Sequence, residues 1–196
     1  MIELVNLSKT YSNGKKVFQN VTSRFESGLL HLIIGHNGSG KTTLLRIIAG
    51  LSTKSEGECL GVKAGASLCF LSTNENTGYP FFTGEEYFTI YLQLYGFSKA
   101  VIQDKLTLLK GKNEILDSAL KTQYQLCSSG MKQSLRLSAA FSIEADLYLL
   151  DEPLRSLDPQ QAEYFMKIIR ELSLQKIVLM SSHQDLPFEK GHVCLL

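Results

Sequence analysis

The stretch Gly35 to Thr42 constrains the fold most, because it spells G-x-x-x-x-G-K-[ST], with Gly40, Lys41 and Thr42 closing the pattern. The apolar run Leu29 to Ile34 before it is typical of a buried strand, and Lys41 to Ala49 after it has apolar residues at helical spacing. Glycines let successive backbone N–H groups converge on phosphate oxygens at a helix N-terminus. Pattern and context therefore predict a phosphate-binding loop, and they disfavour the alternative of a purely structural glycine turn.

This loop predicts a nucleotide site with ATP and Mg²⁺ as its ligands. Lys41 would bring a positive charge to the β- and γ-phosphates, and the Thr42 hydroxyl would reach Mg²⁺. The residues predicted to contact the nucleotide here are Gly35, His36, Asn37, Gly38, Ser39, Gly40, Lys41, Thr42 and Thr43.

Two carboxylates follow a second apolar run, Leu147 to Leu150. The run is typical of a parallel strand, and ligands bind at the C-terminal edge of such a sheet. Asp151 can hold Mg²⁺ through water, and Glu152 can orient or deprotonate the attacking water. The alternative, a strand end with a solvated acidic turn, is less favoured beside a phosphate-binding loop.

The remaining pattern predicts one α/β domain in a chain of 196 residues that is 44% hydrophobic. The runs 2–7 and 16–25 predict a small antiparallel element at the N-terminus, and 147–150, 159–172 and 176–180 predict a βαβ unit. Between about residues 82 and 140 the pattern is mostly helical, with candidate helices at 85–94, 100–109 and 132–140. A strand is also expected over 193–196.

Charge and composition limit the partners. The net charge of +1 gives no general attraction to nucleic acid, so no nucleic-acid partner is expected. The apolar runs are too short to cross a bilayer, and the N-terminus lacks a secretory signal, so a cytoplasmic location is expected. The four cysteines have no metal-ligand spacing and are interpreted as reduced, mostly buried thiols.

A further motif, Cys127-Ser128-Ser129-Gly130-Met131-Lys132-Gln133, lies just before the helix that leads to Leu147. Together with the two motifs above, it resembles the nucleotide-binding domain of ATP-binding cassette (ABC) transporters over essentially the whole chain. The motif is similar to the family signature LSGGQ, whose Ser and Gly bind the γ-phosphate held by the opposite subunit. The resemblance assigns this role to Ser128, Ser129 and Gly130, although Cys127 and Met131 depart from the usual residues and could weaken or retune the contact. By itself, Ser-Ser-Gly before a helix could equally be an ordinary N-cap.

The resemblance assigns three more residues. Asp158, in Ser156-Leu157-Asp158, matches the D-loop that communicates across the dimer, and His183 matches the switch histidine that contacts the γ-phosphate. Tyr11 resembles the aromatic residue that stacks on adenine; a half-buried tyrosine at a strand end is the alternative. The family places a Gln after the strand that here is 67–71, whereas this chain has 72–76 as Ser-Thr-Asn-Glu-Asn, so Thr73 or Asn74 would substitute or the contact is lost.

As a whole, the resemblance implies a P-loop NTPase of the ABC ATPase type: a single domain over 1–196 with a mostly parallel sheet, a core of 1–74 and 141–196, and a helical subdomain at about 75–140. Such a protein hydrolyses ATP with Lys41, Glu152 and His183. It dimerises on ATP, here as a homodimer, and drives separate transmembrane permease subunits that dock near the helical subdomain.

The short chain and its signature variant resemble small exporter ATPases, so we expect an exporter subunit that is peripheral on the inner face of the cell membrane. Two alternatives stay open: a soluble ABC ATPase without a membrane partner, and a nucleotide-binding interaction module with weak hydrolysis.

Overall fold

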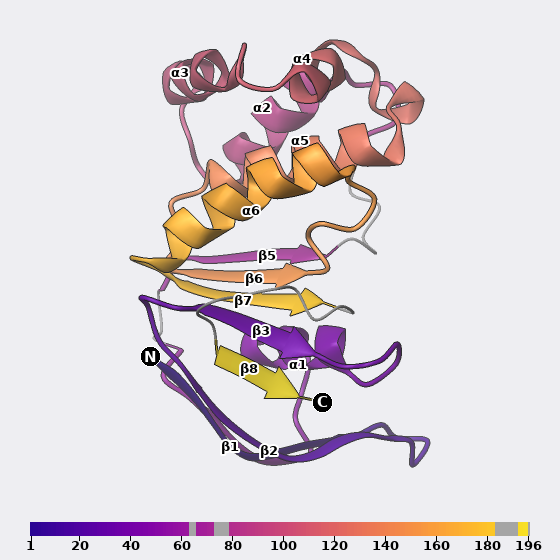
Figure 1. The fold of residues 1–196 in the computed structure, drawn as a ribbon, viewed down its shortest axis with the longest axis vertical. Coiled ribbons are helices and arrows are strands. Elements are labelled where there is room, and N and C mark those ends of the chain that lie inside the picture. The colour runs from indigo at the N-terminus through magenta and orange to yellow at the C-terminus, as the bar shows by residue number, and fades with distance from the viewer. Residues whose placement is uncertain (63–65, 73–78, 183–191, 196) are drawn as a thin grey trace. The chain divides into compact units, whose positions relative to one another are not determined.

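The computed structural model describes residues 1–62, 66–72, 79–182 and the backbone of 192–195 (Figure 1). The chain forms two compact units. The first comprises Met1–Ser72, Ala145–Pro153 and Lys167–Leu196, and the second comprises Thr73–Glu144 and Leu154–Met166. The second unit thus contains the expected helical segment at 75–140, and it also takes in Leu154–Met166, which the sequence analysis assigned to the core.

The first unit is built on a five-stranded sheet whose neighbouring strands all run parallel, as their arrowheads show in Figure 1. The strand order is β5 (Leu68–Ser72), β6 (Leu147–Asp151), β7 (Ile177–Ser182), β3 (Leu30–Ile34) and β8 (His192–Leu195). The register pairs Ser72 with Asp151 and Asp151 with Ser181. Three polar residues therefore lie side by side at the C-terminal edge of the sheet.

A second sheet in the same unit has three antiparallel strands in the order β2 (Lys16–Phe25), β1 (Ile2–Thr10) and β4 (Glu56–Leu60). The sequence predicts β1 and β2 but not β4. The reason is visible in β4 itself, where no residue is fully buried and two of the five are glutamates. Pairing with β1, rather than a hydrophobic pattern of its own, defines this edge strand.

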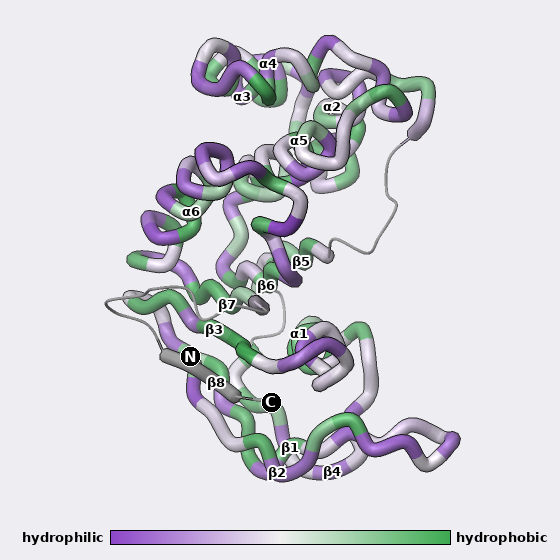
Figure 2. Tube along the Cα trace, turned by 45° about the vertical axis from the view of Figure 1, so that its right-hand side comes forward, coloured by the Kyte–Doolittle hydropathy of each residue, from purple (hydrophilic) through white to green (hydrophobic). Residues whose placement is uncertain are grey.

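Helix α1 (Lys41–Ile48) supplies the core between these strands. Four of its apolar side chains join one buried cluster with residues of both sheets: Ile2, Leu4, Leu7, Phe18, Phe25, Ile33, Leu44, Leu45, Ile47, Ile48, Leu147, Leu149 and Leu179. In Figure 2 the tube changes from green in β3 to white and purple in the loop before α1. The buried apolar side chains of α1 therefore hold this helix in the core, directly after the polar loop.

The second unit is helical. Its elements are α2 (Gly84–Leu94), α3 (Lys99–Leu109), α4 (Glu114–Lys121), the 3₁₀ turn η1 (Tyr124–Leu126), α5 (Ser129–Phe141) and the first half of α6 (Pro159–Ser173). Helix α2 contacts α3, α4 and α5. Helix α4 was not predicted from the sequence; it has only eight residues and follows the N-cap residue Asn113. None of the described helices has both the length and the apolar character needed to cross a membrane.

Candidate nucleotide-binding site

The loop between β3 and α1 depends on glycine. Gly38 and Gly40 have φ values of 83° and 105°, a conformation that other residues adopt at a cost. A Cβ on Gly40 would also lie 2.5 Å from Cγ1 of Val17. The Ser39 amide closes the loop by donating to the His36 carbonyl at 3.1 Å. The predicted phosphate-binding loop is thus a tight turn that ends at the first residue of α1.

The side chains of this loop have the donors that an anion requires. The Lys41 ammonium is almost fully buried and donates to the carbonyls of Gly35 (2.8 Å) and His36 (3.1 Å), so it lies over the loop. The Ser39 hydroxyl is buried and has no hydrogen-bond partner among the described residues. Because a buried hydroxyl without a partner is costly, this atom fits a phosphate oxygen held in the loop.

Asp151 is the centre of a cluster of hydroxyl groups. Its Oδ2 accepts hydrogen bonds from Thr42 Oγ1 (2.7 Å) and Ser72 Oγ (3.1 Å), and its Oδ1 accepts one from Ser181 Oγ (2.7 Å). The carboxylate is 1% exposed. Carboxylate and hydroxyl oxygens beside a phosphate site are the ligands that Mg²⁺ uses, directly or through water. Thr42 and Asp151 therefore fit the metal role that the sequence predicts for them.

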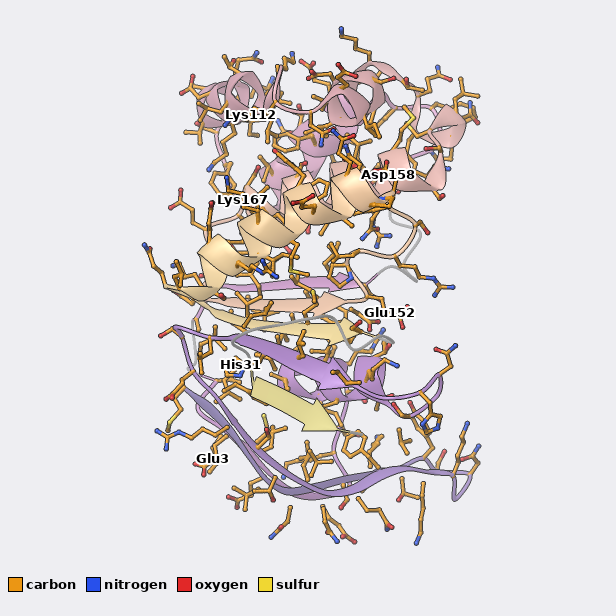
Figure 3. All side chains as sticks on the ribbon, viewed as in Figure 1. Glu3, His31, Lys112, Glu152, Asp158 and Lys167 are labelled. Atoms are coloured by element: carbon orange, nitrogen blue, oxygen red, sulfur yellow. The ribbon has the colours of Figure 1, made fainter. Side chains whose placement is uncertain are left out.

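Glu152 follows directly, at the arrowhead end of β6 (Figure 3). Its φ of 50° lies in the left-handed region, which is uncommon for a residue with a side chain. Its backbone N–H donates to Ser181 Oγ at 2.9 Å. A second acidic residue thus follows Asp151 directly, with its backbone in an unfavourable conformation and hydrogen-bonded to Ser181.

Tyr11 lies in the turn between β1 and β2 and is 44% exposed. Its hydroxyl is 3.2 Å from Thr43 Oγ1 on α1, and the Lys9 ammonium lies 5.3 Å from its ring centroid. An exposed ring whose hydroxyl contacts α1 is suited to stacking on a base. Contact of Tyr11 with adenine remains a prediction.

In the second unit, the signature motif begins helix α5. Ser128 is the N-cap, its Oγ accepting from the Met131 amide at 3.2 Å, and Ser129 and Gly130 form the first turn. A Cβ on Gly130 would lie 3.1 Å from the Ser156 carbonyl oxygen, so the signature and the D-loop are neighbours within this unit. The predicted N-cap geometry and a phosphate-binding role are compatible, because a helix N-terminus attracts anions.

Asp158 directly precedes helix α6 (Figure 3), and its Oδ1 accepts a hydrogen bond from the Gln161 backbone N–H at 2.9 Å. The Gln161 side chain is buried and exchanges two hydrogen bonds with the amide of Asn113, at 2.9 and 3.0 Å. The D-loop helix is thereby tied to the start of α4. Gln161 and Asn113 could not be predicted from the sequence, because only the folded chain brings them together.

Cys127, which replaces the usual Leu of the signature, faces the interior. The residue is 5% exposed, and its Sγ lies 3.9 Å from the carbonyl oxygens of Ala119 and Thr122. Burial raises the pKa of this thiol above its ordinary value. Cys127 is therefore a packing residue.

Some predicted residues lie outside the described part of the chain, namely His183 and the part of the 72–76 segment that follows Ser72, including Thr73 and Asn74. Of the segment 72–76, Ser72 is described, and it donates to Asp151. Ser181, which also donates to Asp151, was not predicted from the sequence. No local signal could have found these two serines, because their relation to Asp151 depends on the order of β5, β6 and β7 in the sheet.

Comparison with known proteins gives the same family. The ABC transporter family matches residues 18–155. The chain is 33% identical to the cytochrome c biogenesis ATP-binding export protein CcmA of Reclinomonas americana, over 97% of this chain and 88% of the relative. It is 30% identical to the uncharacterized ABC transporter ATP-binding protein YcbN of Bacillus subtilis, and the match spans 93% of this chain but only 61% of that longer relative. Other relatives are named as zinc and phosphonates import proteins.

A Pyrococcus furiosus structure named as an ABC transporter ATP-binding protein superposes with a TM-score of 0.81 at 27% identity, covering 100% of this chain and 96% of that one. The parallel sheet, the glycine loop at a helix N-terminus and the paired carboxylates define a P-loop nucleotide-binding protein. Within that class, the chain belongs to the ABC transporter family, as one of its ATP-binding subunits.

Proposed function

We propose that this chain hydrolyses ATP to ADP and phosphate and that the cycle of binding and hydrolysis drives separate membrane-spanning permease subunits. The observation that carries the proposal is the contact of Thr42 with Asp151 beside the Lys41 loop, with Glu152 next in the chain. Phosphate donors, two candidate metal ligands and a second carboxylate thus occupy one sheet edge of the first unit.

Each residue has a separate task in this proposal. Lys41 and the loop amides bind the phosphates, while Thr42 and Asp151 hold the Mg²⁺ site. When held there, Mg²⁺ would supply positive charge close to the phosphoryl oxygens. Glu152 orients the attacking water and accepts its proton, and the leaving ADP takes the bond electrons to its β-phosphate oxygen. His183 is proposed to contact the γ-phosphate.

Two substitutions separate binding from chemistry. We expect Lys41→Ala to abolish productive ATP binding, and Glu152→Gln to keep binding but block turnover, because only the first residue contacts the ground-state phosphates. Nucleotide binding and steady-state phosphate release would be measured, with Lys167→Ala and Glu163→Gln, both at exposed positions, as matched controls. A wild-type chain that binds ATP without releasing phosphate would favour the interaction module, and wild-type turnover by Glu152→Gln would refute the role of Glu152.

The proposed assembly is a homodimer in which each ATP lies between the loop of one copy and Ser128, Ser129, Gly130 and Asp158 of the other. Two observations support it: α5 begins at Ser128, Ser129 and Gly130, and Ser156 of the D-loop lies next to Gly130. With Mg²⁺ and ATP, Glu152→Gln should shift towards the dimer in light scattering, whereas ADP should leave it monomeric. A chain that stays monomeric with ATP at high concentration would contradict the homodimer.

An exposed apolar patch in the second unit supports docking of a permease. Tyr124 and Gln125 donate to the carbonyls of Phe82 and Pro80, at 2.7 and 3.0 Å, so η1 is joined to the turn before α2. These joined segments present Phe81, which is 73% exposed, and Leu126, which is 70% exposed. Exposed apolar side chains that gather on joined segments mark interaction sites, whereas single exposed ones are common on protein surfaces.

The docking test is co-purification in detergent with the neighbouring membrane proteins. We expect Phe81→Ala with Leu126→Ala to reduce recovery of the permease, whereas Leu108→Ala, at an equally exposed leucine of α3, should not. Recovery of no membrane protein by the wild-type chain would favour the soluble alternative. We place the docked subunit on the cytoplasmic face of the cell membrane.

Export is the proposed direction, supported by the export relative that the chain matches over most of its length. In proteoliposomes whose ATP-binding subunits face the outer solution, ATP should then drive cargo into the lumen. Movement of cargo out of the lumen would show an importer.

A further inference from the structure

Ser181 lies at the centre of the contacts around the two carboxylates. Its hydroxyl donates to Asp151 Oδ1 at 2.7 Å and accepts from the Glu152 backbone N–H at 2.9 Å. The residue is 1% exposed and pairs with Asp151 in the β6–β7 ladder. One hydroxyl therefore connects the candidate metal ligand to the backbone of the residue proposed to activate water.

One of the two Ser181 hydrogen bonds is made to Glu152, whose backbone is strained. Glu152 has a φ of 50°, which costs a residue with a side chain about 1 to 3 kcal/mol and persists only when neighbouring contacts enforce it. The bond from its N–H to Ser181 is such a contact. It also sets the direction in which the Glu152 side chain leaves the sheet edge, because the peptide that precedes the side chain is fixed.

We propose that Ser181 is a positioning residue for ATP hydrolysis, which holds the Glu152 backbone in register with Asp151 so that the Glu152 carboxylate reaches the attacking water. This inference rests on the proposed function. A serine suits the task because one hydroxyl can donate and accept at the same time.

The other donors to Asp151 make the role of Ser181 separable. Without the Ser181 hydroxyl, Asp151 keeps the bonds from Thr42 and Ser72, whereas the Glu152 N–H loses the acceptor described here. Loss of Ser181 should therefore disturb the water-activating residue more than the phosphate and metal residues. Loss of the Ser72 hydroxyl should leave the hydrogen bond between the Glu152 N–H and Ser181 in place, because the Ser72 hydroxyl donates to Asp151 Oδ2.

The experiment compares Ser181→Ala, Ser181→Thr and Ser72→Ala in the full chain. Ser173→Ala is the control for loss of a buried, hydrogen-bonded serine in the same unit, since its hydroxyl donates to the Arg170 carbonyl. We expect Ser181→Ala to lower kcat about tenfold or more, with ATP affinity and KM changed less than about twofold. Ser181→Thr should restore most of kcat, and Ser173→Ala should match the wild type.

A second readout does not depend on turnover. By NMR, exchange of the Glu152 amide hydrogen should be about tenfold faster or more in Ser181→Ala, and should stay slow in Ser181→Thr and Ser72→Ala. Fast exchange in Ser181→Ala with a wild-type chain that hydrolyses no ATP would refute the proposed function but keep the backbone contact. Unchanged exchange and kcat in Ser181→Ala, equal loss of ATP affinity and kcat, or failure of Ser181→Thr to restore kcat would each overturn the positioning role.

Discussion

The Thr42 hydroxyl donates a 2.7 Å hydrogen bond to Oδ2 of Asp151, although the two residues are 109 positions apart in the sequence. Thr42 is the second residue of α1, and Asp151 is the last residue of β6. The contact exists because α1 packs its apolar side on β6 and so brings its N-terminus to the C-terminal edge of the sheet. Two oxygen atoms suited to Mg²⁺ are thereby adjacent.

This geometry predicts that Asp151→Asn lowers the Mg²⁺-dependent affinity for ATP about tenfold or more, because the substitution removes the negative charge at the proposed metal site. ATP affinity without Mg²⁺ should change much less. Titration with a fluorescent ATP analogue, with and without Mg²⁺, measures both. Asp146→Asn is the matched control, since Asp146 precedes β6 and contacts Ser67 and Lys176 instead. Equal effects of the two substitutions would contradict the assignment.

The two glycines of the phosphate loop should differ in their tolerance of alanine. Gly38→Ala meets no atom within 4 Å and should cost only the left-handed conformation, about 1 to 2 kcal/mol. Gly40→Ala has the same backbone cost and in addition places a Cβ 2.5 Å from Val17 and 3.0 Å from Phe18, so it should cost about 3 kcal/mol or more. Urea unfolding of the two variants measures the difference, and equal losses would contradict it.

Local patterns allowed prediction of the parts of the site that lie within a few residues of one another. Gly40, Lys41 and Thr42 form one motif, and Asp151 and Glu152 end one apolar run, so strand, loop, helix and acidic edge were predictable. The fold class followed from the same runs. The family comparisons confirm this fold class and the ABC resemblance.

Contacts that depend on strand order or helix packing could not be predicted. Ser72 and Ser181 contact Asp151 only because β5 and β7 flank β6. The helix predicted over 159–172 was assigned to the core, yet the first half of α6 belongs to the second unit, where Phe165 contacts Phe141. A helical pattern shows that one face of the helix is buried, but it does not show which other elements cover that face.

Tyr124 should make the stability of the chain depend on pH in alkaline solution. Burial, followed by the neighbouring Tyr87 phenol, raises the pKa of Tyr124 from 10.0 to about 12. The unfolded chain therefore loses this proton first, so the stabilisation is complete below pH 10 and is lost as the pH rises from 10 to about 12. Over that range the wild type should lose about 2 to 3 kcal/mol more unfolding free energy than Tyr124→Phe. Urea unfolding at stepped pH tests this, and parallel curves would contradict it.

The buried amide pair of Gln161 and Asn113 gives a stability prediction with a neighbouring control. Gln161→Leu removes both hydrogen bonds to the Asn113 amide and a third from Ser134 Oγ at 3.3 Å. Polar atoms of Asn113 and Ser134 are then left buried without this partner, so the substitution should cost about 1 to 3 kcal/mol of unfolding free energy. Gln160→Leu makes the same chemical change at an exposed position of the same helix and should stay within about 0.5 kcal/mol of the wild type.

A double-mutant cycle separates the pair from other effects of each substitution. Asn113→Leu alone also removes the N-cap bond to the Leu116 amide, which should cost about 1 kcal/mol in every background. When both amides are replaced, neither leaves the other unpaired, so the double variant should be more stable than the sum of the two single losses predicts, by about 1 kcal/mol or more. Urea unfolding of the four proteins gives this coupling energy. A coupling near zero, or a loss in Gln160→Leu as large as in Gln161→Leu, would show that the amide pair does not fasten the start of α6 to α4.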